Sequence, residues 1–542
     1  MKIEANLVDI DTQEIYPASI TIKDSHIVSI KRSNEVYNTF ILPGFIDAHI
    51  HIESSMLVPS EFARLAVRHG TVATVSDPHE IANVLGVKGI EYMIKNAKES
   101  GFKCYFGASP CVPATPFETN GAILSPKEIE ELLKQDDIYY LSEVMNFPGV
   151  INNDSDMMAK IALAKKYNKP IDGHAPALSG KELQKYLDVG ITTDHEAFTY
   201  EEAKEKLQKG MKIQIREGSA AKNYEALHLL IEEYFENMMF CSDDKHPNDL
   251  LKGHIKELVK QALKDGHDLF KVLCIASKNP VEHYGLDVGL LRVGDKADFI
   301  EVKDLKNFEI LRTFIDGKEV YASGQIYLPR VKSLHVNNFH TSKKEIRAFE
   351  IEAKGKEYRI IDALNNQLIT KEEHQYLQSK NGVVECDIQK DYLLISVTNR
   401  YEDVSPAVSF VHGFGLKEGA IASSVAHDSH NIIAVGCDAK SMALAVNAVI
   451  ESKGGICVVD SKEKIELLSL PIAGLMSDNS GEKVAKRYEE IENIVKNKLG
   501  STLDAPFMTL SFMALLVIPD IKLSDKGLFD TNSFHFIGEC IL

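Results

Sequence analysis

Between Phe45 and Gly285 the sequence alternates short apolar stretches with longer amphipathic ones. The short stretches have the length and apolar character of buried strands. They are GFIDAHIHI (44–52), TVATVS (71–76), KCYFGAS (103–109), IYYLSEV (138–144), PIDGHA (170–175), ITTDHE (191–196), KIQIRE (212–217) and MMFCSD (238–243). The stretches between and after them have helical periodicity, and several begin at Ser, Thr or Asp and end at Gly or Asn. Among them, residues 223–236 and 248–266 are each predicted to form a single helix. Eight strand–helix units in about 240 residues are typical of an α/β fold, the (β/α)₈ TIM barrel.

Strand-like sequence flanks this region on both sides. Residues 18–32 alternate apolar and polar side chains around Asp24 and Ser25, and residues 289–324 show a similar pattern. We therefore expect residues 1–45 and 285–335 to form one small β-sandwich domain around a barrel of residues 46–284. Residues 340–542 mix strands and helices, such as a helix over 439–455 before a strand over 456–460, and predict a C-terminal α/β-type domain.

Charge and composition narrow the range of partners and compartments. The formal net charge of −18 disfavours nucleic acid as a partner, because phosphate contacts require clustered Lys and Arg. The eight cysteines include no CxxC pair, which favours the reducing cytoplasm. The first 20 residues lack the apolar core of a signal peptide, and FMALLVIP (512–519) is too short to cross a membrane.

Polar residues of metal-binding type follow almost every predicted strand. Because catalytic groups of this fold lie at the carboxyl ends of the strands, we expect these side chains to meet. They are His49 and His51, then Asp77, His79 and Glu80, then Glu143, His174, His195 with Glu196, Arg216 with Glu217, and Asp243 with Asp244. His49 and His51 are two residues apart on one strand, so their imidazoles point to the same side.

Four of these histidines and two of the carboxylates predict a metal site. Nitrogen and oxygen donors without a thiolate suit Zn²⁺, Mn²⁺ or Fe²⁺. Glu143, on the middle strand of the set, is the natural bridge between two ions roughly 3.5–4 Å apart, and Asp243 is placed to take a proton from the water nucleophile. Taken singly, His174 or His195 is more simply a hydrogen-bonded core histidine, and a lone carboxylate is more simply solvated. The occurrence of all four histidines and both carboxylates at the ends of the predicted strands favours the metal site.

Longer motifs connect the chain to a known family. They are LPGFIDAHIHIESSM, SDPHEIANV, LSEVMNFPGV, DGHAP, TDHEAF, REGSA, FCSDD, SVAHDSHNIIAVG and LPIAGLMSD, and they are spread over nearly the whole chain. With these motifs the sequence resembles the amidohydrolase superfamily and, within it, the adenine deaminases. The resemblance extends to the C-terminal domain, and GLLRVGDKADFI resembles the usual return of the chain into the small β-sandwich.

The resemblance implies a set of ligands and a reaction. The implied metal ligands are His49, His51, Glu143, His174, His195 and Asp243. They would hold a binuclear centre of Mn²⁺ or Fe²⁺, with Zn²⁺ as the alternative. Many superfamily members carry a carboxylated Lys on the fourth strand, whereas YYLSEVMNF offers Glu143 and no Lys, in agreement with the adenine deaminases. The implied reaction is hydrolysis of adenine to hypoxanthine and ammonia, in purine salvage.

Deamination also needs a proton at N1 of the purine. Glu80 is our candidate donor, with Glu53 and Glu196 as alternatives, and its carboxyl must be kept protonated by burial or by a like charge. The simpler interpretation is that Asp77, His79 and Glu80 only shape their loop.

Two further groups are candidates for substrate contact. Arg216 and Glu217 line the base pocket or, more simply, form a surface ion pair. The sequence AHDSH brings His427, Asp428 and His430 together, to hold a further metal, to close over the site, or only to satisfy one another in a turn.

Two other functions remain open at this point. One is another amidohydrolase, which acts either on a cyclic amide or on other 6-substituted purines. The absence of a Lys on the fourth strand disfavours the cyclic-amide hydrolase. The other is a catalytically dead relative that serves as a scaffold, which should have lost ligands, whereas all six are present. We expect a small-molecule substrate, adenine, no nucleic-acid or membrane partner, and a homodimer as the candidate assembly.

Overall fold

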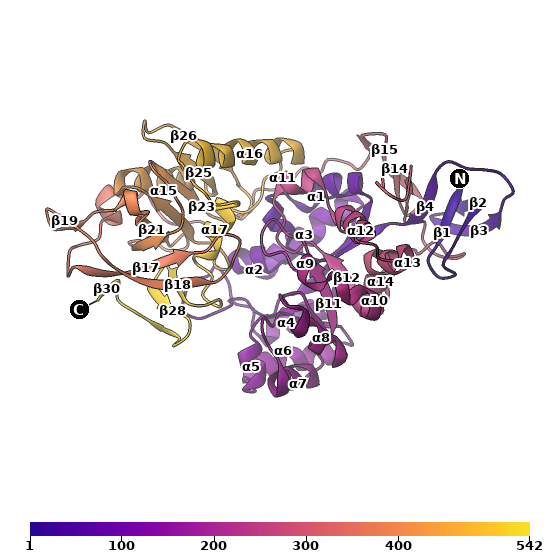
Figure 1. The fold of residues 1–542 in the computed structure, drawn as a ribbon, viewed down its shortest axis with the longest axis horizontal. Coiled ribbons are helices and arrows are strands. Elements are labelled where there is room, and N and C mark those ends of the chain that lie inside the picture. Colours follow the sequence, from indigo (N-terminus) through magenta and orange to yellow (C-terminus); the bar gives the residue numbers. More distant parts are fainter. Residues whose placement is uncertain (542) are drawn as a thin grey trace.

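The computed structural model describes residues 1–541. Three regions follow one another along its long axis (Figure 1). The N-terminal strands lie at one end, parallel strands with their helices occupy the middle, and the C-terminal sheet lies at the other end. In this order, the middle region with its parallel strands lies next to the C-terminal sheet.

The middle region is built from two arcs of parallel strands. The first arc consists of β5 (Phe45–Ile50), β6 (Thr71–Ser76), β7 (Lys103–Ala108), β8 (Ile138–Val144) and β9 (Ile171–Gly173). The second consists of β10 (Thr193–Asp194), β11 (Lys212–Arg216) and β12 (Met238–Cys241). In both arcs the strands pair in sequence order, as expected for strands joined by crossover helices. Each predicted strand of residues 44–243 is present within the described chain.

Hydrogen bonds join the two arcs at both edges. At one edge the amide of Asp243 donates to the carbonyl of His49 (2.9 Å), and Ile50 and Asp243 form a parallel bridge. At the other, the amide of Thr192 donates to the carbonyl of Ile171 (3.0 Å). The carboxyl ends of β5 and β12, which are remote in sequence, are therefore neighbours.

Helices follow most of these strands and cover the arcs. They are α1 (Pro59–Ala66), α2 (His79–Leu85), α3 (Val87–Ser100), α4 (Pro126–Leu133), α5 (Phe147–Ile151), α6 (Ser155–Lys166), α7 (Gly180–Asp188), α8 (Tyr200–Gln208), α13 (Leu269–Leu273) and α14 (Asn279–Tyr284). Local sequence explains several starts: Ser125 accepts from the amide of Lys127 and Glu128 reaches back to Ser125, which is a capping box.

Two stretches predicted as single helices are interrupted. Residues 223–236 form α9 (Tyr224–Leu227) and α10 (Ile231–Tyr234), each followed by a 3₁₀ turn. Residues 248–266 break between α11 (Pro247–Lys252) and α12 (Ile255–Lys264). The second break has a physical reason, because His254 leaves the helical path and its ring bonds to Asp47 (2.8 Å) and Thr71 (2.7 Å).

The two flanks of the middle region share one sheet. Its order is β16 (Gln325–Ile326), β15 (Lys318–Ala322), β14 (Ile310–Ile315), β13 (Phe299–Val302), β4 (Phe40–Pro43), β1 (Lys2–Asp9), β2 (Glu14–Lys23) and β3 (His26–Arg32). β13 pairs antiparallel with β4 and so connects the segment after the arcs with the segment before them. The turn between β2 and β3 lies at Asp24 and Ser25, both at positive φ, as the sequence predicts.

A longer mixed sheet forms the C-terminal region. Its order is β18 (Thr370–Tyr376), β17 (Glu357–Ala363), β22 (Ala407–His412), β21 (Leu393–Thr398), β24 (Ile432–Gly436), β23 (Ala420–Ser423), β25 (Gly455–Val459) and β26 (Ile465–Ser469), with β30 (Cys540–Ile541) beside β17. α15 (Ala439–Glu451) packs on this sheet. Smaller sheets pair β19 (Ser379–Lys380) with β20 (Val383–Val384), and β27 (Ile521–Ser524) with β28 (Gly527–Asp530) and β29 (His535–Phe536).

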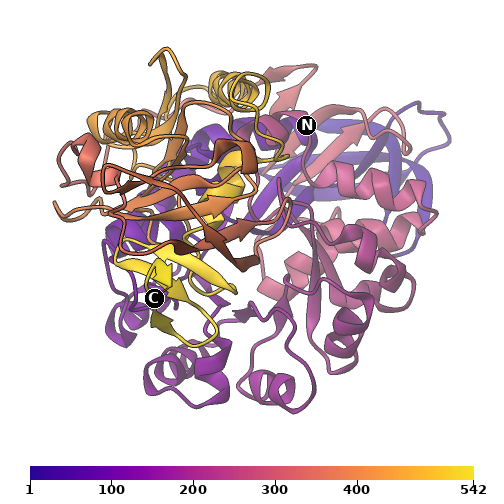
Figure 2. The same cartoon turned by 60° about the vertical axis from the view of Figure 1, so that its left-hand side comes forward.

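The C-terminal region lies directly against the parallel strands and their helices (Figure 2). α16 (Gly481–Asn497) packs on α11, where the Tyr488 hydroxyl bonds to His246 (2.8 Å). Asn431 donates to the carbonyl of Thr119 (3.0 Å) at the same junction. α17 (Pro506–Phe512) is buried beside it. The side chains at the carboxyl ends of the strands are consequently covered by the C-terminal region.

Within residues 1–541, no helix has both the length and the apolar character needed to cross a membrane. The cysteines are free, and most are buried.

Replacing Phe62 by Ala tests the packing between α1 and the arcs. Phe62 is fully buried, and its ring lies against the rings of Phe102 and His254. Loss of this side chain should lower the free energy of unfolding by about 3–5 kcal/mol, measured by urea denaturation. The matched control is Leu229→Ala at an exposed position, which should change it by less than about 0.5 kcal/mol. Equal unfolding midpoints for the two variants would contradict this packing.

Candidate metal centre and active-site cavity

The two histidines of the first parallel strand are buried and face a common point. His51 donates from Nδ1 to the carbonyl of Asp77 (3.0 Å), which leaves Nε2 directed at Glu143 and Asp243, each 3.1 Å away. Neither ring nitrogen of His49 has a hydrogen-bond partner within residues 1–541. Burial, together with the positive charge of a protonated His195 beside it, lowers the pKa of His49. A buried neutral imidazole with free nitrogens is suited to bind a metal ion.

Glu143, at the end of β8, is the shared neighbour of the other imidazoles. Its carboxylate oxygens lie 2.8 Å from His174, 3.1 Å from His51 and 3.3 Å from both His79 and His195. Burial favours the protonated form, but these imidazoles outweigh it and hold the pKa of Glu143 well below its usual value. The result is a buried carboxylate whose two oxygens both face imidazole nitrogens, so ions held between these groups would meet ligands on both sides.

Asp243, after β12, completes this cluster from the opposite side. Its Oδ1 lies 3.1 Å from His51 and 3.6 Å from His49, while Oδ2 accepts from Arg216 (2.5 Å). Burial raises the pKa of Asp243, but Arg216 and the two imidazoles reverse this effect and keep it well below its usual value. Arg216 also forms a buried ion pair with Glu196, whereas the alternative left open from the sequence was a surface ion pair between Arg216 and Glu217.

These groups fit a divalent metal centre. His49, His195 and Asp243 offer donor atoms within 4.8 Å of one another, as do Glu143, His174 and His195. The six predicted ligands are thus brought into one cluster. All its donors are nitrogen or oxygen atoms, which suits Mn²⁺, Fe²⁺ or Zn²⁺.

Asp47 connects the two strands that carry opposite sides of the cluster. Its Oδ1 accepts from the amide of Ser242 (3.0 Å), and its Oδ2 accepts from the Ser242 hydroxyl and pairs with His254 (2.8 Å). Asp47 precedes His49 by two residues and Ser242 immediately precedes Asp243. The carboxylate therefore sets the separation between a histidine and an aspartate of the cluster.

Two buried polar side chains support His174 and His195. The hydroxyl of Tyr186 donates to the carbonyl of Val144 (2.7 Å) and accepts from the amide of His174 (3.0 Å). Lys206 donates to Asp194 (2.9 Å) just before His195. Neither residue was predicted from the sequence, because neither belongs to a strand end and each lies on a helix whose polar face is otherwise solvated.

The loop after β6 meets the C-terminal region. His427 Nε2 lies 2.9 Å from Glu80 Oε1, and His430 Nε2 contacts the other oxygen of Glu80. Burial raises the pKa of Glu80, but the imidazoles of His427, His430 and His79 outweigh it and bring the pKa well below its usual value. This corrects the expectation that the Glu80 carboxyl itself is kept protonated: the imidazoles around it favour the carboxylate.

The neighbouring acids have different environments. Burial raises the pKa of Glu53 to about 7, and its Oε1 accepts from the amide of Ile81 (3.2 Å). Burial also raises the pKa of Asp428 to about 6. Asp77 accepts from the Ser109 hydroxyl (2.6 Å) and bonds to His79 (3.2 Å), so it shapes the loop and orients that imidazole.

A cavity opens over the cluster and has an apolar wall from the C-terminal region. The lining residues at the cluster are His51, Glu143, His174, His195, Glu196, Arg216 and Asp243. The other charged or ionisable lining residues are His79, Glu80, Asp244, His427 and Asp428. The apolar wall consists of Leu368, Phe512, Leu515, Val517 and Ile518. This wall was not predicted from the sequence, because the length of FMALLVIP (512–519) indicates only that the segment is too short to cross a membrane.

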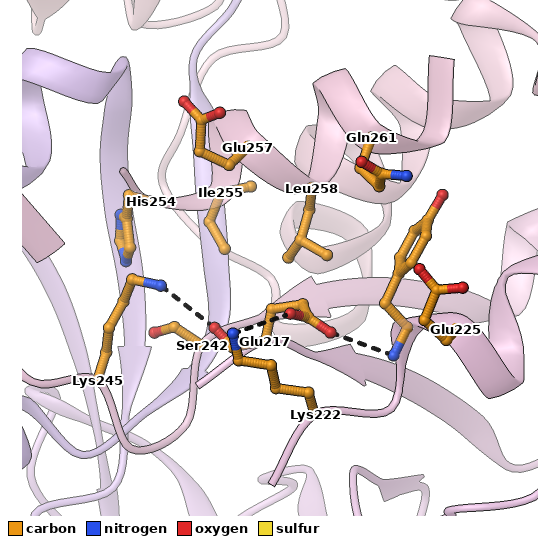
Figure 3. A pocket seen from close by; sticks show the side chains of 11 residues that line it. Glu217, Lys222, Glu225, Ser242, Lys245, His254, Ile255, Glu257, Leu258 and Gln261 are labelled. Atoms are coloured by element: carbon orange, nitrogen blue, oxygen red, sulfur yellow. Dashed lines mark hydrogen bonds and ion pairs between the residues drawn. The ribbon is translucent and has the colours of Figure 1, made fainter. Parts of the chain in front are cut away.

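Glu217 lies away from this cavity, contrary to the expectation that it lines the base pocket. It faces a separate hollow between the loops after β11 and β12 and the helix α12 (Figure 3). There its carbonyl accepts from Lys245 (3.2 Å) and its carboxylate accepts from the amide of Tyr224 (3.3 Å). Arg216 ends β11, and Glu217 follows it in an antiparallel bridge with Lys222, so the two adjacent side chains point to opposite faces.

The family models that match the chain divide it into two parts. The amidohydrolase family model matches residues 40–320, and the adenine deaminase C-terminal domain model matches residues 367–535.

Curated relatives match over nearly the full length. An adenine deaminase of Sulfurovum sp. is 62% identical over 100% of both chains. Those of Borreliella burgdorferi and Salinibacter ruber are 53% and 52% identical over 99% of both chains. Among solved structures, a β-aspartyl dipeptidase of Fervidobacterium islandicum covers 60% of this chain and 98% of its own, with 16% identity and a TM-score of 0.47.

Replacing Glu143 by Gln tests the metal centre. The amide keeps the shape of the side chain but removes the charge between the imidazoles, so it cannot bridge two cations. After loading with Mn²⁺ and desalting, the variant should retain less metal than the wild type by about one ion or more per chain, measured by elemental analysis. Glu217→Gln is the control and should keep the wild-type metal content. Equal metal content in the two variants would contradict a bridging role for Glu143.

Proposed function

The chain belongs to the adenine deaminase family of the amidohydrolase superfamily, and we propose that the cavity above Glu143 is where it deaminates adenine. The enzyme hydrolyses adenine and releases ammonia and hypoxanthine. The observation that carries the proposed location is the buried cluster of histidines and carboxylates under an apolar wall. The wall suits a planar purine ring, and the cluster suits hydrolysis at one edge of that ring.

The proposed centre is binuclear, with His49, His51, Glu143, His174, His195 and Asp243 as ligands. Glu143 would be shared between the ions, which are Mn²⁺ or Fe²⁺ in our proposal, with Zn²⁺ as the alternative. When bound, such ions supply a water nucleophile that ionises near neutral pH. The free nitrogens of His49, and the position of the Glu143 oxygens between His51 and His174, support this arrangement.

The side chains supply proton transfer and orientation. Asp243 is kept ionised by Arg216, so it is able to accept a proton from water and return it to the departing amine. The second proton of water replaces the proton delivered to N1, because hypoxanthine keeps a proton there. Glu80 remains the proposed donor to N1. Since its carboxylate is ionised at rest, a neighbouring group has to carry that proton.

The two arcs of parallel strands also have a proposed relation to each other. We propose that the two arcs close into one (β/α)₈ barrel of residues 46–284, which the hydrogen bonds at both edges support. Two accessory domains would flank the barrel, one formed by residues 1–45 together with 285–335 and the other by residues 340–542.

Cytoplasmic purine salvage is the proposed setting, and the free cysteines among the described residues agree with a reducing compartment. That two copies of the chain form a homodimer stays a prediction.

The first experiment follows ammonia and hypoxanthine from adenine with Mn²⁺-loaded protein. Asp243→Asn should lower kcat by about 10²–10⁴-fold, because the amide accepts no proton. Asp249→Asn, outside the cavity, is the control and should keep wild-type kcat. Wild-type protein that carries metal and leaves adenine unchanged would contradict the proposal. Other 6-substituted purines and cyclic amides would then be screened.

Replacing Phe512 by Ala tests the apolar wall. Phe512 is almost fully buried and lines the cavity opposite the cluster. Losing its contact with the purine ring should lower kcat/KM for adenine by roughly tenfold, or about 1.4 kcal/mol. The control is Phe534→Ala at an exposed position, which should leave kcat/KM unchanged. An unchanged kcat/KM in Phe512→Ala would place the purine elsewhere.

A further inference from the structure

His427 lies where the C-terminal region meets the loop after β6. We propose that His427 carries the proton that Glu80 delivers to N1 of adenine, so that the C-terminal region supplies part of the catalytic machinery. This inference rests on the proposed function and adds to it a proton carrier from a separate region of the chain. His427 lies 347 positions after Glu80 in the sequence, and only the fold brings the two side chains together.

The contacts of His427 suit a group that gains and loses a proton. Its Nε2 lies 2.9 Å from Glu80 Oε1 and 3.5 Å from Asp244 Oδ1. Its Nδ1 bonds to the Ser511 hydroxyl (2.6 Å). A hydroxyl is able to donate or accept, so it accommodates both the neutral ring and the imidazolium. The two carboxylates stabilise the protonated ring, whose pKa is well above its usual value despite burial.

The position of His427 suits transfer to a substrate. It lines the active-site cavity beside Glu80 and Asp428, and only 5% of its surface is exposed. Its Nε2 and both Glu80 oxygens have no aligned hydrogen-bond partner within residues 1–541, although they are in contact. Catalytic hydrogen bonds are often poorly aligned before the substrate is bound.

The two neighbouring histidines are poorer carriers. His430 Nδ1 accepts from the amide of Ala426 (3.2 Å), so its proton stays on Nε2 and the ring has no second site for exchange. His79 contacts Glu143 (3.3 Å), and its protonated form would face the proposed metal ions. His427 contacts none of the six proposed ligands.

Other groups around His427 fix the positions of its ring and of its partners. His427 also lines a small hollow together with Ser54, His246 and Ser511. Ser54 donates to Asp244 (2.5 Å) and so holds that carboxylate. The ring of Phe512 packs against the imidazole, with ring centroids 5.4 Å apart, and restricts its rotation.

Each proton-transferring side chain regains its starting protonation state at the end of one turnover. The His427 imidazolium gives its proton to the Glu80 carboxylate, and the Glu80 carboxyl then gives a proton to N1 as water adds to C6. Asp243 moves one proton of water to the departing amine, which leaves as ammonia. The remaining proton, on the new C6 oxygen, returns through Glu80 to His427 as the carbonyl forms. No oxidant or further reactant is needed.

The test compares His427→Gln and His427→Ala with the wild type in the Mn²⁺-loaded full-length protein. We expect kcat for adenine to fall by about 10²-fold or more in both, with KM changed by less than about threefold. The limb of the pH profile of kcat that reports the acid should disappear. Added imidazole should restore part of kcat in His427→Ala, because the cavity left by the ring admits it.

The matched control is His246→Gln. His246 is also buried, lines the same small hollow and contacts the C-terminal region through Tyr488, but it has no contact with Glu80. It should retain kcat within about threefold and the wild-type pH profile. Metal content and melting temperature are measured for each variant, so that lost folding is separated from lost transfer.

Three outcomes would overturn the role of His427. One is wild-type kcat in His427→Gln. Another is loss of kcat with an unchanged pH profile and no rescue by imidazole in a folded, metal-loaded variant, which would indicate a structural role. A rise in KM alone would indicate substrate binding. Failure of the proposed function looks different, because the wild type itself would then leave adenine unchanged.

Discussion

The carboxylate of Glu143 is the interaction on which the rest of this site depends. Among the described residues it contacts the imidazoles of His51, His79, His174 and His195, which come from different strand ends and loops. A buried carboxylate is costly unless its oxygens are matched by cations or donors. The strands that deliver these imidazoles are therefore held to one geometry. Asp47, Tyr186 and Lys206 support that geometry from behind.

The C-terminal region turns an open strand-end surface into an enclosed cavity. It contributes the apolar wall with Phe512 and the polar side with His427. Enclosure matters for the reaction, because exclusion of water strengthens every charge interaction in the cavity. It also surrounds Glu80 with imidazoles, which changes the protonation state of that carboxyl. The C-terminal region is remote in sequence from the proposed metal ligands, but it determines the charge environment of Glu80 beside them.

Much of the architecture was predictable from local patterns. The parallel strands lie where the apolar stretches predicted them, because most of these strands are buried on both faces and are rich in apolar residues. The breaks in the helical stretches over 223–236 and 248–266 were not predictable. Their amphipathic spacing continues through the break, and at His254 the reason is a partner, Asp47, that lies 207 residues away in the chain.

The sequence by itself determined the donor set, since HxH at a strand end and single His, Glu and Asp residues at later strand ends are local features. It also determined the family, through motifs spread along the chain. Only the tertiary structure decided that Arg216 faces the cluster while Glu217 faces another hollow, and that Glu80 is ionised beside His427. The physical reason is that protonation and orientation depend on neighbours in space. Those neighbours come from segments whose contacts no local pattern records.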